Sequence, residues 1–126
     1  MPTWNLSDMH HHILLCNGSN CTSAGAEEVT RAVRAEIKAR GLNHQIHTTR
    51  TRCNGRCEDK CVSIVYPDGI WYKNLTPEDA APFIDSIMNQ EENLADKISH
   101  QFNGVHFERT EGTIVGKEKR SKNLTK

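Results

Sequence analysis

Apolar residues along residues 1–90 fall into short runs, which are typical of strands, and spaced repeats, which are typical of helices. Short runs at residues 12–15, 61–67 and 70–72 predict three strands, the last two joined in a hairpin. Residues 43–51, with Ile46 as their central apolar side chain, predict a half-exposed or edge strand. The pattern therefore predicts a small sheet of about four strands.

Two main helices are predicted between and after these strands. The first should run from about residue 24 to residue 40, with Thr22 or Ser23 as its N-cap. The second should cover residues 76–88, starting from Thr76 in a sequence close to a capping box. The apolar side chains of the first helix recur at three- and four-residue intervals and form one stripe: Ala26, Val29, Val33 and Ile37.

The order strand, helix, strand, strand, strand, helix over residues 12–90 predicts an α/β fold. The first two strands should be parallel neighbours joined by a right-handed crossover. We expect residues 1–90 to form the folded domain and residues 91–126 to form a polar extension, partly helical at 94–102 or disordered. The last ten residues carry five positive charges and one negative charge, which favours disorder.

Composition excludes several classes of function. The chain has 126 residues and a net charge of zero, so no global field favours nucleic acid or a membrane. No apolar run approaches the roughly 18 to 20 residues that span a bilayer. The start of the chain lacks the features of a secretory signal, which predicts a cytoplasmic protein. In that reducing compartment, five clustered cysteines indicate a metal or redox site rather than a disulfide framework.

Four of the cysteines are expected to meet at one end of the sheet. Cys16 and Cys21 flank the turn after the first strand, and Cys53 and Cys57 lie in the loop after the second. If the two strands are parallel neighbours, both loops leave the sheet at the same end. Four thiolates there suit zinc or an iron–sulfur cluster, and the start of the predicted helix favours anionic sulfur.

The spacing of the cysteines separates the alternatives without deciding between them. Structural zinc sites usually use C-x2-C, whereas this chain has C-x4-C and C-x3-C, which favour the wider two-iron cluster. The chain has no C-x-x-C, so a thioredoxin-type dithiol is not indicated. A zinc-binding adaptor and a thiol–disulfide protein of thioredoxin-like fold remain as alternatives. We find no nucleophile–base pair or phosphate loop, which favours a protein that is not itself an enzyme.

The segments 16-CNGSNCTSAGAEEV-29, 53-CNGRC-57 and 64-IVYPDGIWYKNLTPEDA-80 resemble the thioredoxin-like [2Fe-2S] ferredoxins, which include the 24-kDa-type subunit of NADH dehydrogenase. The resemblance implies a thioredoxin-like fold, one-electron transfer to a redox partner protein, and a homodimer. It also implies a [2Fe-2S] cluster bound by four cysteines, namely Cys16, Cys21, Cys53 and Cys57.

Two further points follow from the resemblance. The segment 16-CNGSNC-21 also looks like small ferredoxin-like proteins encoded with cobalamin-biosynthesis enzymes, which suggests that pathway. Many family members have a glycine–proline pair where this chain has Lys60 and Cys61. Position 61 starts the predicted buried strand, so we expect Cys61 to be a packing residue near the cluster rather than a ligand. Nearby arginines could offset the cluster's negative charge or simply be solvated: Arg50, Arg52 and Arg56.

Overall fold

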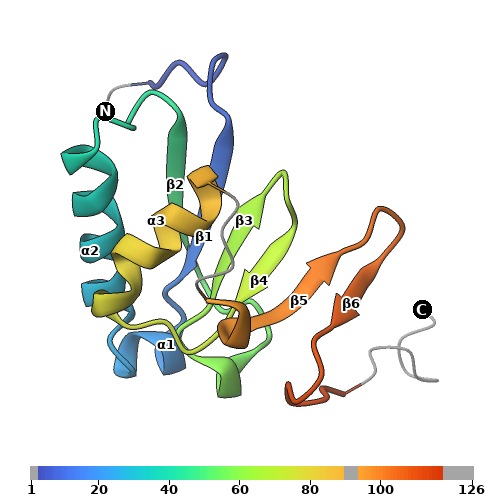
Figure 1. Ribbon diagram of the computed structural model, residues 1–126. Coiled ribbons are helices and arrows are strands. Elements are labelled where there is room, and N and C mark those ends of the chain that lie inside the picture. The colour runs from blue at the N-terminus through green and yellow to red at the C-terminus, as the bar shows by residue number, and fades with distance from the viewer. Residues whose placement is uncertain (1–2, 90–93, 118–126) are drawn as a thin grey trace.

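Six strands form one mixed sheet in the order β2-β1-β3-β4-β5-β6 (Figure 1). The computed structural model describes residues 3–89 and 94–117. The sheet holds two more strands than the sequence predicts, but the α/β class is as predicted. The strands are β1 (His11–Cys16), β2 (Ile46–Thr51), β3 (Ser63–Tyr66), β4 (Ile70–Tyr72), β5 (Ile98–Phe102) and β6 (Phe107–Arg109).

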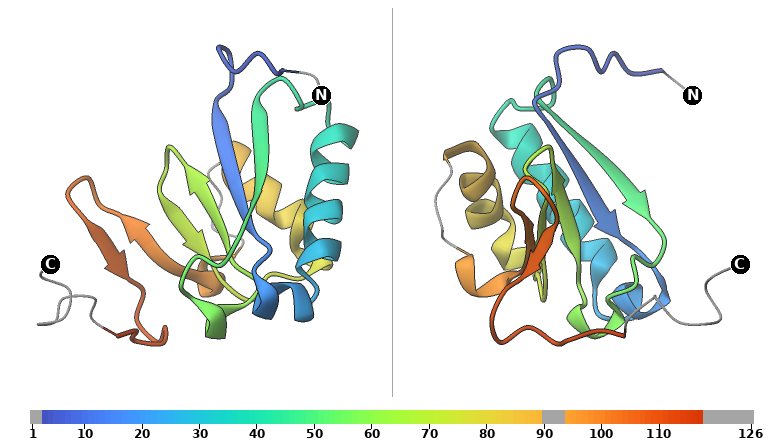
Figure 2. Two further views of the ribbon diagram at one scale, coloured as in Figure 1. Left: turned by 180° about the vertical axis from the view of Figure 1, so that it is seen from behind. Right: turned by 90° about the vertical axis from the view of Figure 1, so that its right-hand side faces the viewer.

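The two longest helices, α2 and α3, lie on one side of this sheet (Figure 2). The α-helices are α1 (Ser19–Ser23), α2 (Ala26–Ala39) and α3 (Ala80–Asn89). Single turns of 3₁₀-helix are η1 (Cys57–Asp59), η2 (Pro77–Asp79) and η3 (Ala95–Lys97). No helix within residues 3–89 and 94–117 is long and apolar enough to cross a membrane.

The predicted parallel pair is confirmed. Strands β1 and β2 run in the same direction, in a register that places His11 beside Ile46 and Cys16 beside Thr51. Both strands therefore end at the same edge, and the loops that follow them carry the four cysteines. The predicted hairpin of β3 and β4 is also present, although β3 begins at Ser63 rather than at residue 61.

The apolar stripe predicted for the first helix is confirmed and forms one wall of the core. Its four side chains are each at most 3% exposed: Ala26, Val29, Val33 and Ile37. They pack with Ile13 and Leu15 from β1 and with Phe83 from α3, and each such large side chain contributes about 1.5–3 kcal/mol by leaving water. Packing of α2 against β1 thus fixes where the loop after β1 begins.

The start of the first helix differs from the prediction. A short helix, α1, occupies residues 19–23, where we expected a loop and then a cap at Thr22 or Ser23. The Thr22 hydroxyl donates instead to the carbonyl oxygen of Asn17 at 3.0 Å, which closes the turn that begins α1. Gly25, at φ 99°, separates the two helices, because only glycine adopts this left-handed conformation readily.

The start of the second helix agrees with the prediction. Thr76 and Asp79 form a capping box, with the backbone N–H of Thr76 donating to the Asp79 carboxylate at 2.8 Å. The turn η2 precedes α3, so Pro82 falls in the first turn of the α-helix, where its missing N–H costs little.

The extension, predicted to be partly helical at 94–102 or disordered, is helical only in the single turn η3, because β5 begins at Ile98 and pairs antiparallel with β4. The edge of β4 presents unpaired backbone groups, and pairing satisfies them while burying Ser99 to 1% exposure. Strand β6 then pairs with β5, so the sheet continues past residue 90, where we placed the end of the domain. The basic tail at residues 118–126 lies outside the described residues.

Candidate metal centre

The four predicted ligand positions gather at one end of the sheet. Cys16 is the last residue of β1, Cys21 lies in α1, Cys53 follows β2, and Cys57 opens η1. Helix α1 and η1 lie side by side at that end in all three views (Figures 1 and 2). The structure thus brings the C-x4-C and C-x3-C loops together, as the parallel strands predict.

Close contact between the two loops depends on Gly18. A Cβ atom at this position would lie 2.8 Å from both the Cα and the backbone nitrogen of Cys53, closer than such atoms approach in proteins. The loop after β1 therefore rests directly on the backbone of Cys53. Only a residue without a side chain permits this approach.

The Cys16 thiol is buried and surrounded by hydrogen-bond donors. It is 4% exposed, and its sulfur lies 3.5 Å from the carbonyl oxygen of Arg52. Burial opposes its ionisation, but the Gly18 amide, the Cys21 thiol and both the backbone and side chain of Asn54 hold its pKa below the usual value. Because Asn54 belongs to the C-x3-C loop, that loop stabilises a thiolate of the C-x4-C loop.

The Cys21 thiol has the opposite tendency. Burial raises its pKa to about 12, with the backbone amide of Val62 opposing the shift and Cys16 adding to it. Of the two neighbouring thiols, Cys16 therefore ionises more readily than Cys21. A metal ion bound there would favour the thiolate of Cys21, because a coordinating thiol loses its proton.

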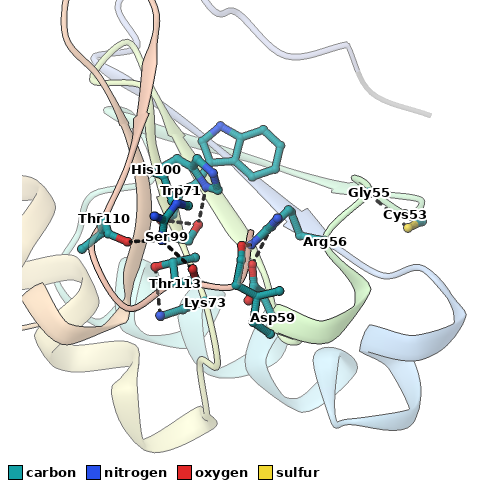
Figure 3. Close-up of polar contacts among 12 residues, drawn as sticks. Cys53, Gly55, Arg56, Asp59, Trp71, Lys73, Ser99, His100, Thr110 and Thr113 are labelled. Atoms are coloured by element: carbon teal, nitrogen blue, oxygen red, sulfur yellow. Dashed lines mark hydrogen bonds and ion pairs between the residues drawn. The ribbon is translucent and has the colours of Figure 1, made fainter. Parts of the chain in front are cut away.

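Cys53 lies at the solvent-facing side of the site. It is exposed, and the backbone N–H of Gly55 donates to its sulfur at 3.3 Å (Figure 3). The side chain of Cys57 lies outside the described part of the chain, and its backbone opens η1. The role of the four cysteines as a ligand set therefore stays a prediction.

Cys61 is buried beside the C-x4-C loop. It is 3% exposed, and its sulfur lies 3.6 Å from the carbonyl oxygens of Cys21 and Ala24, to which the thiol donates. Burial raises its pKa, and the neighbouring Cys16 adds to the shift. A neutral thiol that anchors the backbone of α1 agrees with the expectation of a packing residue near the cluster.

The donor set suits iron bound by thiolate. Backbone amides aim at three sulfurs, those of Gly18 at Cys16, Val62 at Cys21 and Gly55 at Cys53. Hydrogen bonds of this kind set the potential of iron–sulfur clusters. Among the described side chains, which do not include that of Cys57, no three His, Cys, Asp or Glu side chains surround one point as they do around a single metal ion.

Sequence reasoning missed the residues that join the loops. The sequence carries a usable signal, because each loop holds an Asn-Gly pair beside a cysteine, Asn17-Gly18 and Asn54-Gly55.

The structure shows the contacts of the three arginines near the cysteines. Arg50 pairs with Glu27 at 2.8 Å, Arg56 pairs with Asp59 at 2.6 Å, and Arg52 is exposed.

The part of the chain that holds both cysteine loops is similar to known proteins. Residues 5–88 match the family model described as thioredoxin-like [2Fe-2S] ferredoxin. A putative 2Fe-2S ferredoxin of Priestia megaterium is 40% identical over 107 residues, covering 85% of this chain and 84% of that protein. A 2Fe-2S ferredoxin of Clostridium pasteurianum is 31% identical over 84 residues, 60% of this chain and 82% of that protein.

Solved structures show the same fold. A thioredoxin-like [2Fe-2S] ferredoxin from Aquifex aeolicus superposes with a TM-score of 0.66 at 24% identity, covering 74% of this chain and 93% of that chain. The wild-type crystal structure of such a ferredoxin from the same organism gives a TM-score of 0.63 at 25% identity, over 71% of this chain and 96% of that chain. The predicted thioredoxin-like fold is confirmed.

Proposed function

Since the chain belongs to the thioredoxin-like [2Fe-2S] ferredoxin family, we propose that it supplies single electrons to a redox enzyme through a cluster ligated by Cys16, Cys21, Cys53 and Cys57. Membership establishes the coarser part, an electron-transfer protein that binds a [2Fe-2S] cluster. When bound, that cluster supplies one-electron redox chemistry. The identity of the ligands and of the receiving enzyme is the proposal.

The contact between the two cysteine loops is the main observation that supports this ligand set. Gly18 of the first loop rests on the backbone of Cys53, and Asn54 of the second loop donates to the Cys16 sulfur. The second loop therefore supports the Cys16 thiolate, and the packing of Gly18 holds the backbone of Cys53 beside the first loop. Binding of a cluster between the loops would release the protons of the ligand thiols, because thiolates are the ligands of iron.

The chain's own residues tune and expose the site. Cys16 and Cys21 are buried, which limits the access of water to their side of the site. Cys53 is exposed, so a redox partner approaches from the Cys53 side, where the path for an electron through protein is shortest. Arg52, also exposed on that side, favours a partner with acidic residues around its redox centre.

The direct test is electron paramagnetic resonance of the full chain, purified without oxygen and reduced with dithionite. We expect the signal of a one-electron-reduced [2Fe-2S] cluster, together with about two irons and two sulfides per chain. A colourless protein with one equivalent of zinc would instead support the zinc adaptor. Loss of two thiols on oxidation, with no iron bound, would support the thiol–disulfide alternative.

The pathway and location are finer proposals. A role in cobalamin biosynthesis rests on the resemblance of 16-CNGSNC-21, and a strain that lacks the chain but still makes cobalamin would contradict it. A cytoplasmic location fits a site built from thiols that must stay reduced to take up iron. Fractionation of the native cells would test the location.

The homodimer is likewise a proposal. The sheet face opposite the helices carries three partly exposed aromatic side chains, with exposures of 37 to 42%: Tyr66, Phe102 and Phe107. Exposed apolar clusters of this kind favour association with another chain. We expect sedimentation equilibrium of the cluster-loaded protein to give twice the mass of one chain, and a monomer at micromolar concentration would contradict the proposal.

A further inference from the structure

Arg56 lies inside the C-x3-C loop and connects it to two other parts of the chain. Its side chain is only 15% exposed, and its Nε donates to the Asp59 carboxylate at 2.6 Å. Its Nη2 donates to the carbonyl oxygen of Ile114, also at 2.6 Å, far along the chain. One guanidinium therefore holds the cysteine loop, η1 and the segment after β6 together.

Asp59 transmits this anchoring to the backbone that carries Cys57. Its carboxylate is 3% exposed, and its backbone N–H donates to the carbonyl oxygen of Arg56 at 2.9 Å. Its own carbonyl oxygen accepts from the backbone N–H of Asn74 at 2.8 Å. The turn from Arg56 to Asp59 is thus closed by both backbone and side chain, with Cys57 inside it.

The segment at residues 110–117, which we call the C-terminal segment, is itself held in place. Thr113 is 3% exposed, accepts from the Lys73 ammonium at 3.1 Å, and accepts at its carbonyl oxygen from Arg109 at 2.7 Å. In Figure 2 this segment turns back beneath the sheet toward η1. Arg56 therefore donates to a carbonyl oxygen that is itself held in place, so this hydrogen bond can fix the C-x3-C loop.

Gly116 brings the C-terminal segment directly onto Arg56. A Cβ atom at this position would lie 2.9 Å from Nη1 of Arg56, so the segment packs against the guanidinium without a side chain between them. Beside this contact, a cleft of about 290 Å³ lies between the loop at Asn54–Arg56 and residues including Trp71, His100 and Gly116. Arg56 itself lines that cleft.

We propose that Arg56 is a positioning residue for the cluster, and that through it the C-terminal segment forms part of the cluster site. This inference rests on the proposed ligand set, in which Cys53 and Cys57 flank Arg56. In this proposal, neither Arg56 nor the C-terminal segment supplies a ligand atom to the cluster. They fix the loop whose Gly55 amide donates to the Cys53 sulfur, and thereby the hydrogen bonds that set the potential.

Two substitutions test the proposal from opposite sides of the contact. Arg56→Lys keeps the charge but lacks the planar fork that reaches Asp59 and Ile114 together. Gly116→Ala keeps Arg56 and every charge but inserts a methyl group against Nη1. Matched controls are Arg52→Lys, which changes an exposed arginine just before Cys53, and Val115→Ala, which changes a 71% exposed neighbour of Gly116.

The readouts are the cluster's reduction potential, the width of its resonance signal after reduction, and the time for half of the cluster to be lost in air. We expect both test variants to shift the potential, broaden the signal and shorten that half-life about fivefold, while both controls match the parent. Circular dichroism of each variant checks that the fold is retained.

Each outcome decides between the possibilities. If both test variants behave like the controls, the proposal is wrong although the ferredoxin assignment stands. If only Arg56→Lys has an effect, the contact with the C-terminal segment does not matter, and the proposal is again wrong. If the parent chain holds no cluster at all, the failure is that of the proposed function.

Discussion

Replacement of any one of Cys16, Cys21, Cys53 and Cys57 by alanine is expected to lower the bound iron and sulfide at least tenfold, whereas Cys61→Ala should leave them near the parent value. A [2Fe-2S] cluster uses four thiolates, and alanine offers neither a charge nor a donor atom in place of the missing one. Alanine is preferred to serine because a serine oxygen can itself bind iron. Iron, labile sulfide and visible absorption, measured on protein purified without oxygen, check this result.

Cys61→Ala is the matched control for these four variants. It removes a buried thiol that donates to the carbonyl oxygens of Cys21 and Ala24, and it leaves every proposed ligand in place. We expect a stability cost of about 1 kcal/mol with the cluster retained. Retention of the cluster in Cys57→Ala with loss in Cys61→Ala would mean that the fourth ligand is Cys61.

The convergence of the cysteine loops was predictable because it depends on strand direction alone. The apolar runs and the stripe on α2 indicate a strand, a crossover helix and a second strand. Such a unit is almost always parallel, so both of its strands end at one edge of the sheet. The placement of Cys16 at the end of the first strand and of Cys53 after the second then follows from the chain order.

Features that depend on contacts between distant segments were not predictable. The segment at residues 98–109 has little apolar area and no clear period, and it becomes two strands because β4 offers an unpaired edge. The partners of Arg56 could not be foreseen, since Ile114 lies 58 residues away and belongs to the same extension. Propensity gives no information on such pairings.

The even spacing of Cys53, Cys57 and Cys61 gives a different lesson. The interval suggests three equivalent positions, but the backbone treats them differently. Cys53 lies in an exposed loop, Cys57 opens η1, and Cys61 is buried under α1. Equal spacing places side chains on one face only within a regular helix or strand. No such element spans these three cysteines, so their spacing does not make their surroundings alike.

Gly18→Ala is expected to lower cluster occupancy by a factor of about 5 to 150, although Gly18 supplies no ligand atom, because overpacking of about 1–3 kcal/mol separates the two loops. The new methyl group would lie 2.8 Å from two backbone atoms of Cys53, and backbone cannot move aside as the end of a flexible side chain can. Gly18 lies outside the positive-φ region, so alanine fits its own conformation and the effect reports on the contact alone.

Ser19→Ala is the matched control, since Ser19 is the exposed neighbour of Gly18 and the first residue of α1. Iron and sulfide content of the two variants, prepared side by side, measure the effect, and circular dichroism checks that the helices are retained. If Gly18→Ala binds as much cluster as Ser19→Ala, the two loops do not need this close approach. The site would then tolerate a wider separation of Cys16 and Cys53 than the packing of Gly18 on the Cys53 backbone implies.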